Sequence, residues 1–246
     1  MKNSVFVTIV MVVAFAIAAY IYYGIFGTAD HSSILHHLYQ GGPLVIILIV
    51  LTLMNITFVF ERIFSLNKAA GRGSVTKYLK NLQTSLANGD VEQAIEHCDR
   101  QRGSVANIIR QGLEKYQSLK NSSAPLEEKM KDVQKAVEEA TMLEVPLLEK
   151  NLIALSTIAS IATMVGLLGT TIGMIRAFQA LARAGAPDAI QLSIGISEAL
   201  VNTAGGLIAA IIGIVAYNFF VNKVDSFTYM IEEASFNVVQ TLSNKK

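Results

Sequence analysis

Glu198 is the residue whose position most strongly suggests chemistry. It is the one carboxylate inside an otherwise apolar run that is long enough to cross a bilayer. A charged group at such a position costs on the order of 2.5–3.5 kcal/mol on insertion scales and is functional by default. Arg176 and Glu198 are equally far from Pro187, which places them level across an antiparallel helical hairpin. Proton handling by Glu198 and an ion pair with Arg176 are equally open.

Hydroxyl groups are the second feature of chemical interest. Ser156, Ser160, Thr163 and Thr170 follow one another at spacings that place them along one helix face. Hydroxyls in membrane helices commonly bond back to their own helix or join two helices. A regular stripe over four turns equally fits a wet, ion-conducting seam, so both interpretations remain open.

Four stretches without Asp, Glu, Lys or Arg must position these groups. The shortest has 24 residues and as a helix covers roughly 36 Å, more than the ~30 Å hydrocarbon core. Their continuous apolar pattern indicates helices, and the low charged fraction of 16% argues against a soluble domain. We predict an all-α integral membrane protein with four transmembrane helices, drawn from the stretches 3–29, 31–60, 151–175 and 199–222.

The cations indicate how the chain is oriented. Of the 20 Lys and Arg residues, 14 lie between Arg62 and Lys150, which places that segment and both termini in the cytoplasm by the positive-inside rule. The first apolar run, from Val5 to Phe26, is longer than a signal-peptide core, so we predict a retained helix, with a cleaved signal as the alternative. The predicted segments are an extra N-terminal transmembrane helix with a short periplasmic loop (1–42), a transmembrane helix (43–66), a cytoplasmic helical domain (67–150), a transmembrane helix pair (151–222) and a cytoplasmic C-terminal helix (223–246).

The cytoplasmic segment shows amphipathic helical periodicity. Asn88-Gly89 is a stop signal, Asp90 a cap that starts a second helix, and Ser104 the start of a third. We expect their apolar faces to pack on one another. From Pro125 nothing stops a helix before Gly185, so the third span is predicted to be the end of one long helix, kinked at Pro146.

Several functional classes are excluded or disfavoured. A net charge of +1 argues against nucleic-acid binding. The single cysteine, Cys98, excludes a disulfide framework or a cysteine-based metal site within one chain. His31, His36 and His37 lie in a short loop without paired carboxylates, so no metal is predicted. No nucleotide-binding or catalytic motif is present, so we predict neither an enzyme nor a protein cofactor.

Small residues recur at spacings of three or four in the last two spans. Such patterns allow helix backbones to approach closely, within one chain or between copies. The predicted packing residues are Gly166, Gly169, Gly173, Gly205, Ala209 and Gly213.

Two segments in these spans resemble the paired signatures of the MotA/TolQ/ExbB proton-channel family, with the ExbB and TolQ branch the most similar. They are GLLGTTIG at 166–173, followed by Phe178, and GISEALVNTAGGLIAA at 195–210, followed by Tyr217-Asn218. The resemblance is specific over 152–220, looser over 43–150 and absent over 1–42. The chain departs from the family pattern in Asn202, in Ile212 where many members have proline, and in its extra N-terminal span.

The resemblance implies a homopentamer in the bacterial inner membrane, with the last two spans lining a central pore. Thr170 and Thr203 match pore-facing threonines and Glu198 the family glutamate; with Thr163 of the hydroxyl stripe they form the predicted proton pathway. The family's small single-span partner, of the ExbD or TolR type, sits inside the pore and supplies an essential aspartate. A TonB- or TolA-like transducer transmits the work, and the transported ion is a proton or Na⁺.

The predicted function is therefore an ExbB-like stator subunit that energises TonB-dependent transport across the outer membrane. A TolQ-like envelope role and a MotA-like motility or gliding stator are alternatives within the family. A non-conducting scaffold, held together by the small-residue faces in the lipid bilayer, is the alternative from another class. A carrier is weakened by the lack of paired inverted halves with broken helices.

Overall fold

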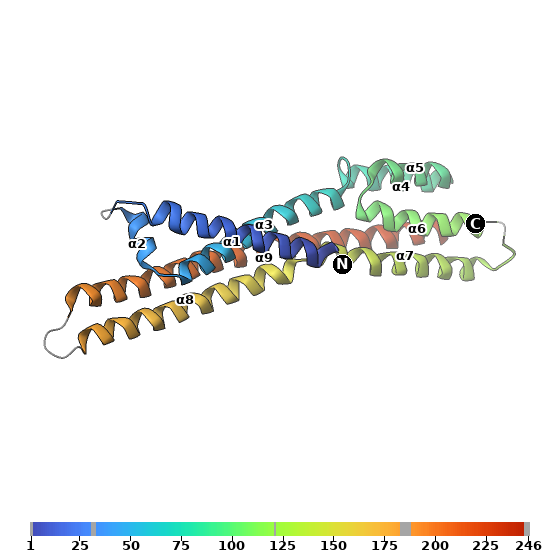
Figure 1. Ribbon diagram of the computed structural model, residues 1–246. Helices are drawn as coiled ribbons and strands as arrows, with labels where there is room; N and C mark the ends of the chain where they lie inside the picture. Colours follow the sequence, from blue (N-terminus) through green and yellow to red (C-terminus); the bar gives the residue numbers. More distant parts are fainter. Residues whose placement is uncertain (1, 31–32, 121, 183–187, 244–246) are drawn as a thin grey trace. The chain divides into compact units, whose positions relative to one another are not determined.

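Helices make up all the regular structure of the described chain, residues 2–30, 33–120, 122–182 and 188–243. Figure 1 shows this computed structural model. No strand occurs in those ranges, which confirms the all-α prediction. In chain order the elements are α1 (Lys2–Tyr20), η1 (Ile21–Phe26), α2 (Ile34–Gln40), α3 (Leu44–Ala70), α4 (Val75–Asn88), α5 (Val91–Gln101), α6 (Ser104–Ser118), α7 (Leu126–Glu149), α8 (Leu152–Leu181) and α9 (Ala189–Ser243).

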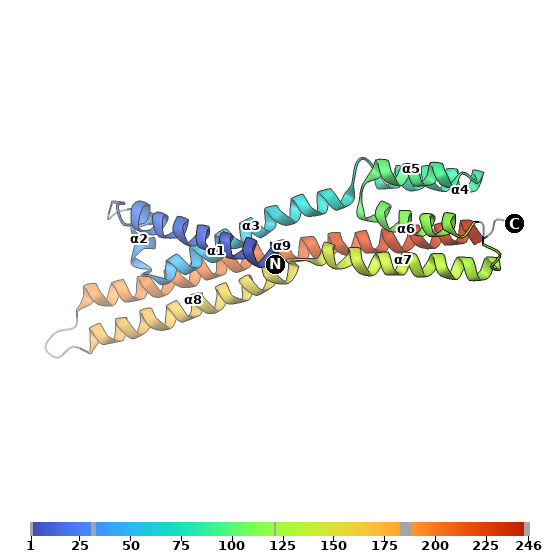
Figure 2. The ribbon, with the colours of Figure 1, turned by 45° about the vertical axis from the view of Figure 1, so that its right-hand side comes forward.

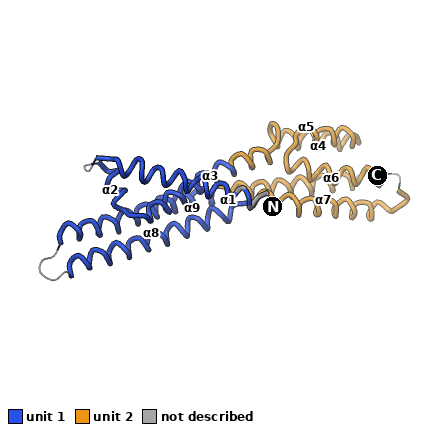
Figure 3. Tube along the Cα trace, viewed as in Figure 1, with its two compact units in different colours: residues 1–61, 151–219 blue, residues 62–150, 220–246 orange. Residues whose placement is uncertain are grey.

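The chain divides into two compact units, which Figure 3 shows in different colours. Unit 1 comprises Met1–Glu61 and Asn151–Phe219, and unit 2 comprises Arg62–Lys150 and Phe220–Lys246. Helices α3 and α9 each begin in unit 1 and end in unit 2. The helical segment predicted over 67–150 therefore shares its unit with the last turns of α3 and α9.

Four helical stretches of the described chain are long and apolar enough to cross a bilayer, as predicted. They begin at Val7, Leu44, Leu126 and Ala189, and the mean hydropathy of their apolar windows lies between 2.0 and 2.5. In the third stretch the apolar part is α8, because α7 is rich in Lys and Glu. These lengths and compositions confirm the four-span prediction.

The first span changes its helical geometry near its end. It runs as an α-helix to Tyr20 and continues as a π-helix over Ile21–Phe26. Within this wider turn the Tyr22 hydroxyl donates a hydrogen bond of 3.0 Å to the Tyr39 carbonyl, and the two rings lie 4.8 Å apart. Tyr22 therefore holds the end of this span against α2. Retention of the span in the cell remains a prediction.

The prediction of one helix from Pro125 to Gly185 is wrong. Helix α7 ends at Glu149 and α8 begins at Leu152. Lys150 is extended, and Asn151 adopts a left-handed conformation with φ of 63°. Asparagine tolerates this conformation better than most residues, and the Asn151 side chain also donates to Glu61 Oε2 at 3.2 Å. Pro146 lies within α7, and Gly185 is outside the described residues.

Unit 2 contains the three predicted amphipathic helices as α4, α5 and α6. Gly89 ends α4 in a left-handed conformation, and the Asp90 side chain caps α5 by accepting from the Gln93 amide. Helix α4 packs on α5, α5 on α6, and α6 on α7, which confirms the expected packing of their apolar faces. The core formed in this way includes Leu82, Leu86, Ile108, Ile109 and Leu113, all at most 1% exposed.

Cys98 is buried in this core and is expected to resist alkylation. Its side chain lies 3.1 Å from the Tyr78 hydroxyl, and burial raises the pKa of the thiol from 9.0 to about 11. At pH 8 the folded protein then has about a hundredfold less thiolate than the unfolded chain. We expect iodoacetamide to label Cys98 at least that much more slowly in native than in urea-unfolded protein.

The same pKa shift gives a pH dependence of stability. Below pH 9 the thiol is protonated in both states and contributes no pH dependence. Between pH 9 and about 11 the unfolded thiol ionises first, so the contribution of Cys98 to stability falls as pH rises.

A Ser74→Cys variant, at an exposed position, serves as the control for the iodoacetamide labelling of Cys98. Equal labelling rates at positions 74 and 98 in the folded protein would contradict this assignment.

Candidate functional site

Four of the predicted site residues, Thr170, Arg176, Glu198 and Thr203, lie where α8 meets α9 in unit 1, a contact called the α8–α9 seam below. The two helices run side by side in both Figure 1 and Figure 2. Arg176 Nη1 donates to both carboxylate oxygens of Glu198, at 2.6 and 2.7 Å. The Glu198 side chain is 5% exposed and that of Arg176 is 55% exposed. The structure thus brings these two residues together, although Pro187, the apex assumed for the hairpin, lies outside the described residues.

Two threonine hydroxyls meet across the same seam. Thr170 Oγ1 and Thr203 Oγ1 are in direct hydrogen-bond contact. Because each hydroxyl has one proton, one threonine donates across the seam while the other donates to a carbonyl of its own helix, Gly166 for Thr170 or Ala199 for Thr203. Both side chains are half-buried. The seam therefore contains a polar contact between two largely apolar spans.

The rest of the hydroxyl stripe behaves differently. Ser156, Ser160 and Thr163 each donate to a carbonyl three or four residues earlier in α8. Among the described residues none of these three hydroxyls bonds to another helix, whereas Thr170 does. In the single chain the stripe is therefore satisfied by its own backbone, and the pore-lining role of Thr163 remains a prediction.

Two buried asparagines join the helices of unit 1, and sequence reasoning gave neither a role. Asn202 donates to the Gly41 carbonyl at 2.7 Å and to the Glu198 carbonyl at 2.9 Å. Asn55 of α3 donates to the Ala209 carbonyl of α9 at 2.9 Å. Both side chains are fully buried. The criterion that singled out Glu198, a polar side chain inside an apolar run, would also have found them.

Glu198 and Asn202 together hold the corner between α2 and α3. Gly42 there has a φ of +75°, and a Cβ at this position would lie 2.7 Å from Glu198 Oε1. The neighbouring Gly41 carbonyl accepts from Asn202. A residue with a side chain at Gly42 would be strained and would displace the carboxylate. The Glu198 carboxylate is thus paired with Arg176 and also packed against the backbone at Gly42.

The predicted packing glycines form the seam itself on α8, but their partners on α9 were missed. A Cβ on Gly173 would lie 2.6 Å from the Ala199 amide nitrogen, and a Cβ on Gly206 would lie 2.7 Å from the Ala162 carbonyl. Gly195 similarly faces Ala177. Gly195, Ala199, Asn202 and Gly206 recur at intervals of four, three and four, a spacing that could have revealed this face.

Gly205 and Ala209 face α3, whereas Gly213 lies against both α3 and α8. A Cβ on Gly205 would meet the Leu48 side chain, and one on Gly213 would lie 2.8 Å from Ala159 Cβ of α8 and 2.9 Å from the Asn55 amide nitrogen of α3. Ala209 is fully buried, and its carbonyl accepts from Asn55. Helix α9 therefore uses two small-residue faces, one for α8 and one for α3.

These features define a multi-pass helical membrane protein whose last two spans share a polar seam. The model of the MotA/TolQ/ExbB proton channel family matches residues 100–233, more than half of the chain. The chain belongs to this family. The match covers α6, α7, α8 and most of α9, and so includes the whole seam.

Individual relatives carry the names TolQ and ExbB. The Tol-Pal system protein TolQ of Haemophilus influenzae is 34% identical over 138 residues, covering 51% of this chain and 60% of TolQ. The biopolymer transport protein ExbB of Pseudomonas putida is 37% identical over 89 residues, covering 36% and 27%. ExbB of Aquifex aeolicus is 34% identical over 113 residues, covering 46% and 69%. The chain spans less than two thirds of the first two relatives.

Proposed function

We propose that this protein is the proton-conducting stator subunit of a bacterial inner-membrane motor. In this proposal five copies surround single-span helices of an ExbD/TolR-type partner, and both termini are cytoplasmic. Proton flow drives a TonB-like transducer and energises transport across the outer membrane. The observation that carries the proposal is the hydroxyl pair of Thr170 and Thr203, which gives a member of a proton-channel family a polar path between two apolar helices.

The chemistry of the seam explains why a partner is needed. Hydroxyls can pass a hopping proton along a hydrogen-bond chain, but they do not store one at physiological pH. Glu198 is the carboxylate of the seam, and Arg176 occupies both of its oxygens. A second carboxylate, supplied by the partner helix, is therefore required for reversible protonation.

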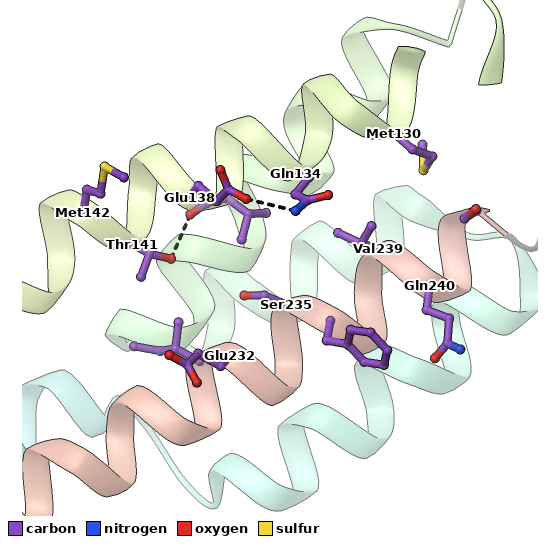
Figure 4. Close-up of a pocket in the computed structure, with 13 residues that line it drawn as sticks. Met130, Gln134, Glu138, Thr141, Met142, Glu232, Ser235, Val239 and Gln240 are labelled. Carbon is purple, nitrogen blue, oxygen red and sulfur yellow. Dashed lines mark hydrogen bonds between the residues drawn. The ribbon is translucent and has the colours of Figure 1, made fainter. Parts of the chain in front are cut away.

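Unit 2 has a surface suited to contact between copies. A groove of about 730 Å³ runs between α7 and α9 (Figure 4). Met142 and Phe236, which line it, are 73% and 66% exposed. Contiguous apolar surface of this kind is typical of protein–protein contact sites. In the proposed homo-oligomer, neighbouring copies cover these side chains.

Two other functions have specific support. Relatives named TolQ match the chain at identities similar to those named ExbB, so an envelope-maintenance role in place of TonB-dependent transport is the second candidate. A MotA-like stator rests on the family alone. In a scaffold that conducts nothing, the hydroxyl pair would serve only to join α8 to α9. Native mass spectrometry of the complex distinguishes these classes first, since a stator requires five copies and a small partner.

Removal of one seam hydroxyl tests the proton pathway directly. Thr203→Val preserves the shape of the side chain but breaks the contact with Thr170. We expect proton flux to fall by about tenfold or more in proteoliposomes containing the native complex, because one link of the proton path is lost. Flux is measured with a pH-sensitive dye after a pH jump.

Thr171→Val is the matched control. Thr171 neighbours Thr170 but is exposed, and its hydroxyl bonds only to the Leu167 carbonyl of its own helix. This variant should conduct as the wild type does. Equal fluxes from the two variants would exclude the seam as the proton path and would favour the scaffold.

A further inference from the structure

A small pocket in unit 2 combines unpaired cations with a helix N-terminus. Its volume is about 220 Å³. It lies where the end of α3 meets the start of α6 and the end of α7, so all of its walls belong to the same unit. Ser65, Lys68, Arg102, Gly103 and Ser104 form its polar side, and Leu147 and Leu148 form an apolar side.

The charge in the pocket is not balanced by its neighbours. Neither Lys68 nor Arg102 forms an ion pair within the described chain; Arg102 Nε donates only to the Asp99 carbonyl. The Asp99 carboxylate is paired with Arg110 instead. Glu144 is the acidic residue of the pocket, and its Oε1 accepts from the Asn107 amide. Two cations thus face one carboxylate that already has a hydrogen-bond donor.

Ser104 adds a donor with no partner. It lines the pocket, is 6% exposed, and its hydroxyl makes no hydrogen bond to any residue in the described ranges. A hydroxyl on the wall of a pocket in an otherwise buried side chain is a donor that a ligand oxygen can use. Ser104 is also the first residue of α6, a helix of 15 residues whose N-cap, Gly103, offers no side-chain cap. The positive end of that helix dipole favours an anion at the same point.

We propose that this pocket binds a phosphate group, as carried by the headgroup of an anionic membrane lipid or by free inorganic phosphate. Lys68, Arg102 and the Ser104 hydroxyl would donate to its oxygens, and the tetrahedral anion fits the available volume. The position favours a lipid, because Ser65 follows Phe60, the last residue of the uncharged stretch, by only five residues of α3. That is roughly 7.5 Å of helical rise, within the headgroup region. Exposed Leu147 offers a surface for an acyl chain.

The test measures both ligands on the full-length protein in detergent. Phosphatidylglycerol is titrated and counted as bound adducts by native mass spectrometry, and inorganic phosphate is titrated by calorimetry. The site variant is Lys68→Gln with Arg102→Asn, because asparagine tolerates the left-handed conformation of Arg102. We expect it to weaken phosphatidylglycerol binding by about tenfold or more.

The matched control removes the same charge elsewhere in unit 2. Lys77→Gln with Lys80→Gln changes two exposed lysines outside the pocket and should leave binding within about twofold of the wild type. A third variant, Ser104→Ala, retains all charges and should still weaken binding several-fold. A loss of affinity in this variant would distinguish binding in a specific pocket from nonspecific electrostatic attraction.

The possible results either identify the ligand or exclude the proposed site. Weaker phosphatidylglycerol binding in the site variants, with an unchanged control, supports the lipid headgroup. The same pattern for inorganic phosphate alone supports a soluble phosphate ligand. Equal effects of the site and control variants on both ligands, or no effect of Ser104→Ala, would overturn the proposal. None of these measurements depends on proton conduction.

Discussion

Glu198→Ala is expected to reduce proton flux strongly and also to destabilise the seam. The change leaves the Arg176 guanidinium without its carboxylate. Thr203 lies five residues further along α9, at roughly 7.5 Å of helical rise. The uncompensated Arg176 charge repels a proton at the nearby hydroxyl pair, and because the guanidinium is 55% exposed and partly screened, we expect flux to fall by about tenfold.

The stability cost of this variant is smaller than for a fully buried pair. Removing one partner of a buried ion pair costs about 3–5 kcal/mol. Arg176 is 55% exposed, so its charge is partly solvated and the loss lies at the lower end of that range. Thermal unfolding of the detergent-solubilised complex measures the loss of stability, and a flux assay in proteoliposomes measures the loss of proton conduction. Wild-type values of both would show that the pair has no role.

A double variant separates pairing from proton handling. Arg176→Gln with Glu198→Gln removes both charges and retains a hydrogen bond between the two amide side chains. We expect it to recover both stability and flux relative to Glu198→Ala, because no uncompensated charge remains beside the hydroxyl pair. Recovery of stability without flux would instead show that Glu198 itself takes up a proton. The single variants Arg176→Gln and Glu198→Gln complete a double-mutant cycle, which gives the interaction energy of the pair.

Sequence reasoning identified the helices well, because their signals are local. The stop at Gly89 and the cap at Asp90 appear in the structure, since a left-handed glycine and a capping carboxylate need only their own neighbours. The break at Asn151 was not predictable in this way. It depends on a left-handed asparagine and on a contact with Glu61, ninety positions earlier in the sequence.

The site shows the same division between local and distant information. The ion pair could be anticipated, because a hairpin fixes which residues lie level on two adjacent helices. The roles of Asn55 and Asn202 could not be read in full, because their partners are the carbonyls of Ala209 and Gly41. Every residue has a carbonyl, so the sequence carries no signal for such an acceptor.

Gly206→Ala is expected to destabilise the protein far more than Gly205→Ala, although the two residues are adjacent. A Cβ on Gly206 would lie 2.7 Å from the Ala162 carbonyl oxygen and 2.9 Å from Gly166 Cα. Both atoms belong to the backbone of α8, so the helices themselves must separate. A Cβ on Gly205 would lie 3.1 Å from Leu48 Cδ1, the flexible end of a side chain.

The difference between these two alanine variants tests the seam without changing any polar group. Both substitutions gain about 0.5–1 kcal/mol from helix propensity, so the difference comes from overpacking, which costs typically about 1–3 kcal/mol and more where the backbone must move. Thermal unfolding of the solubilised protein gives the comparison. Helix separation also breaks the contact of Thr170 with Thr203, so Gly206→Ala should lose flux together with stability. Similar midpoints for the two variants would mean that α8 and α9 do not approach this closely in the membrane.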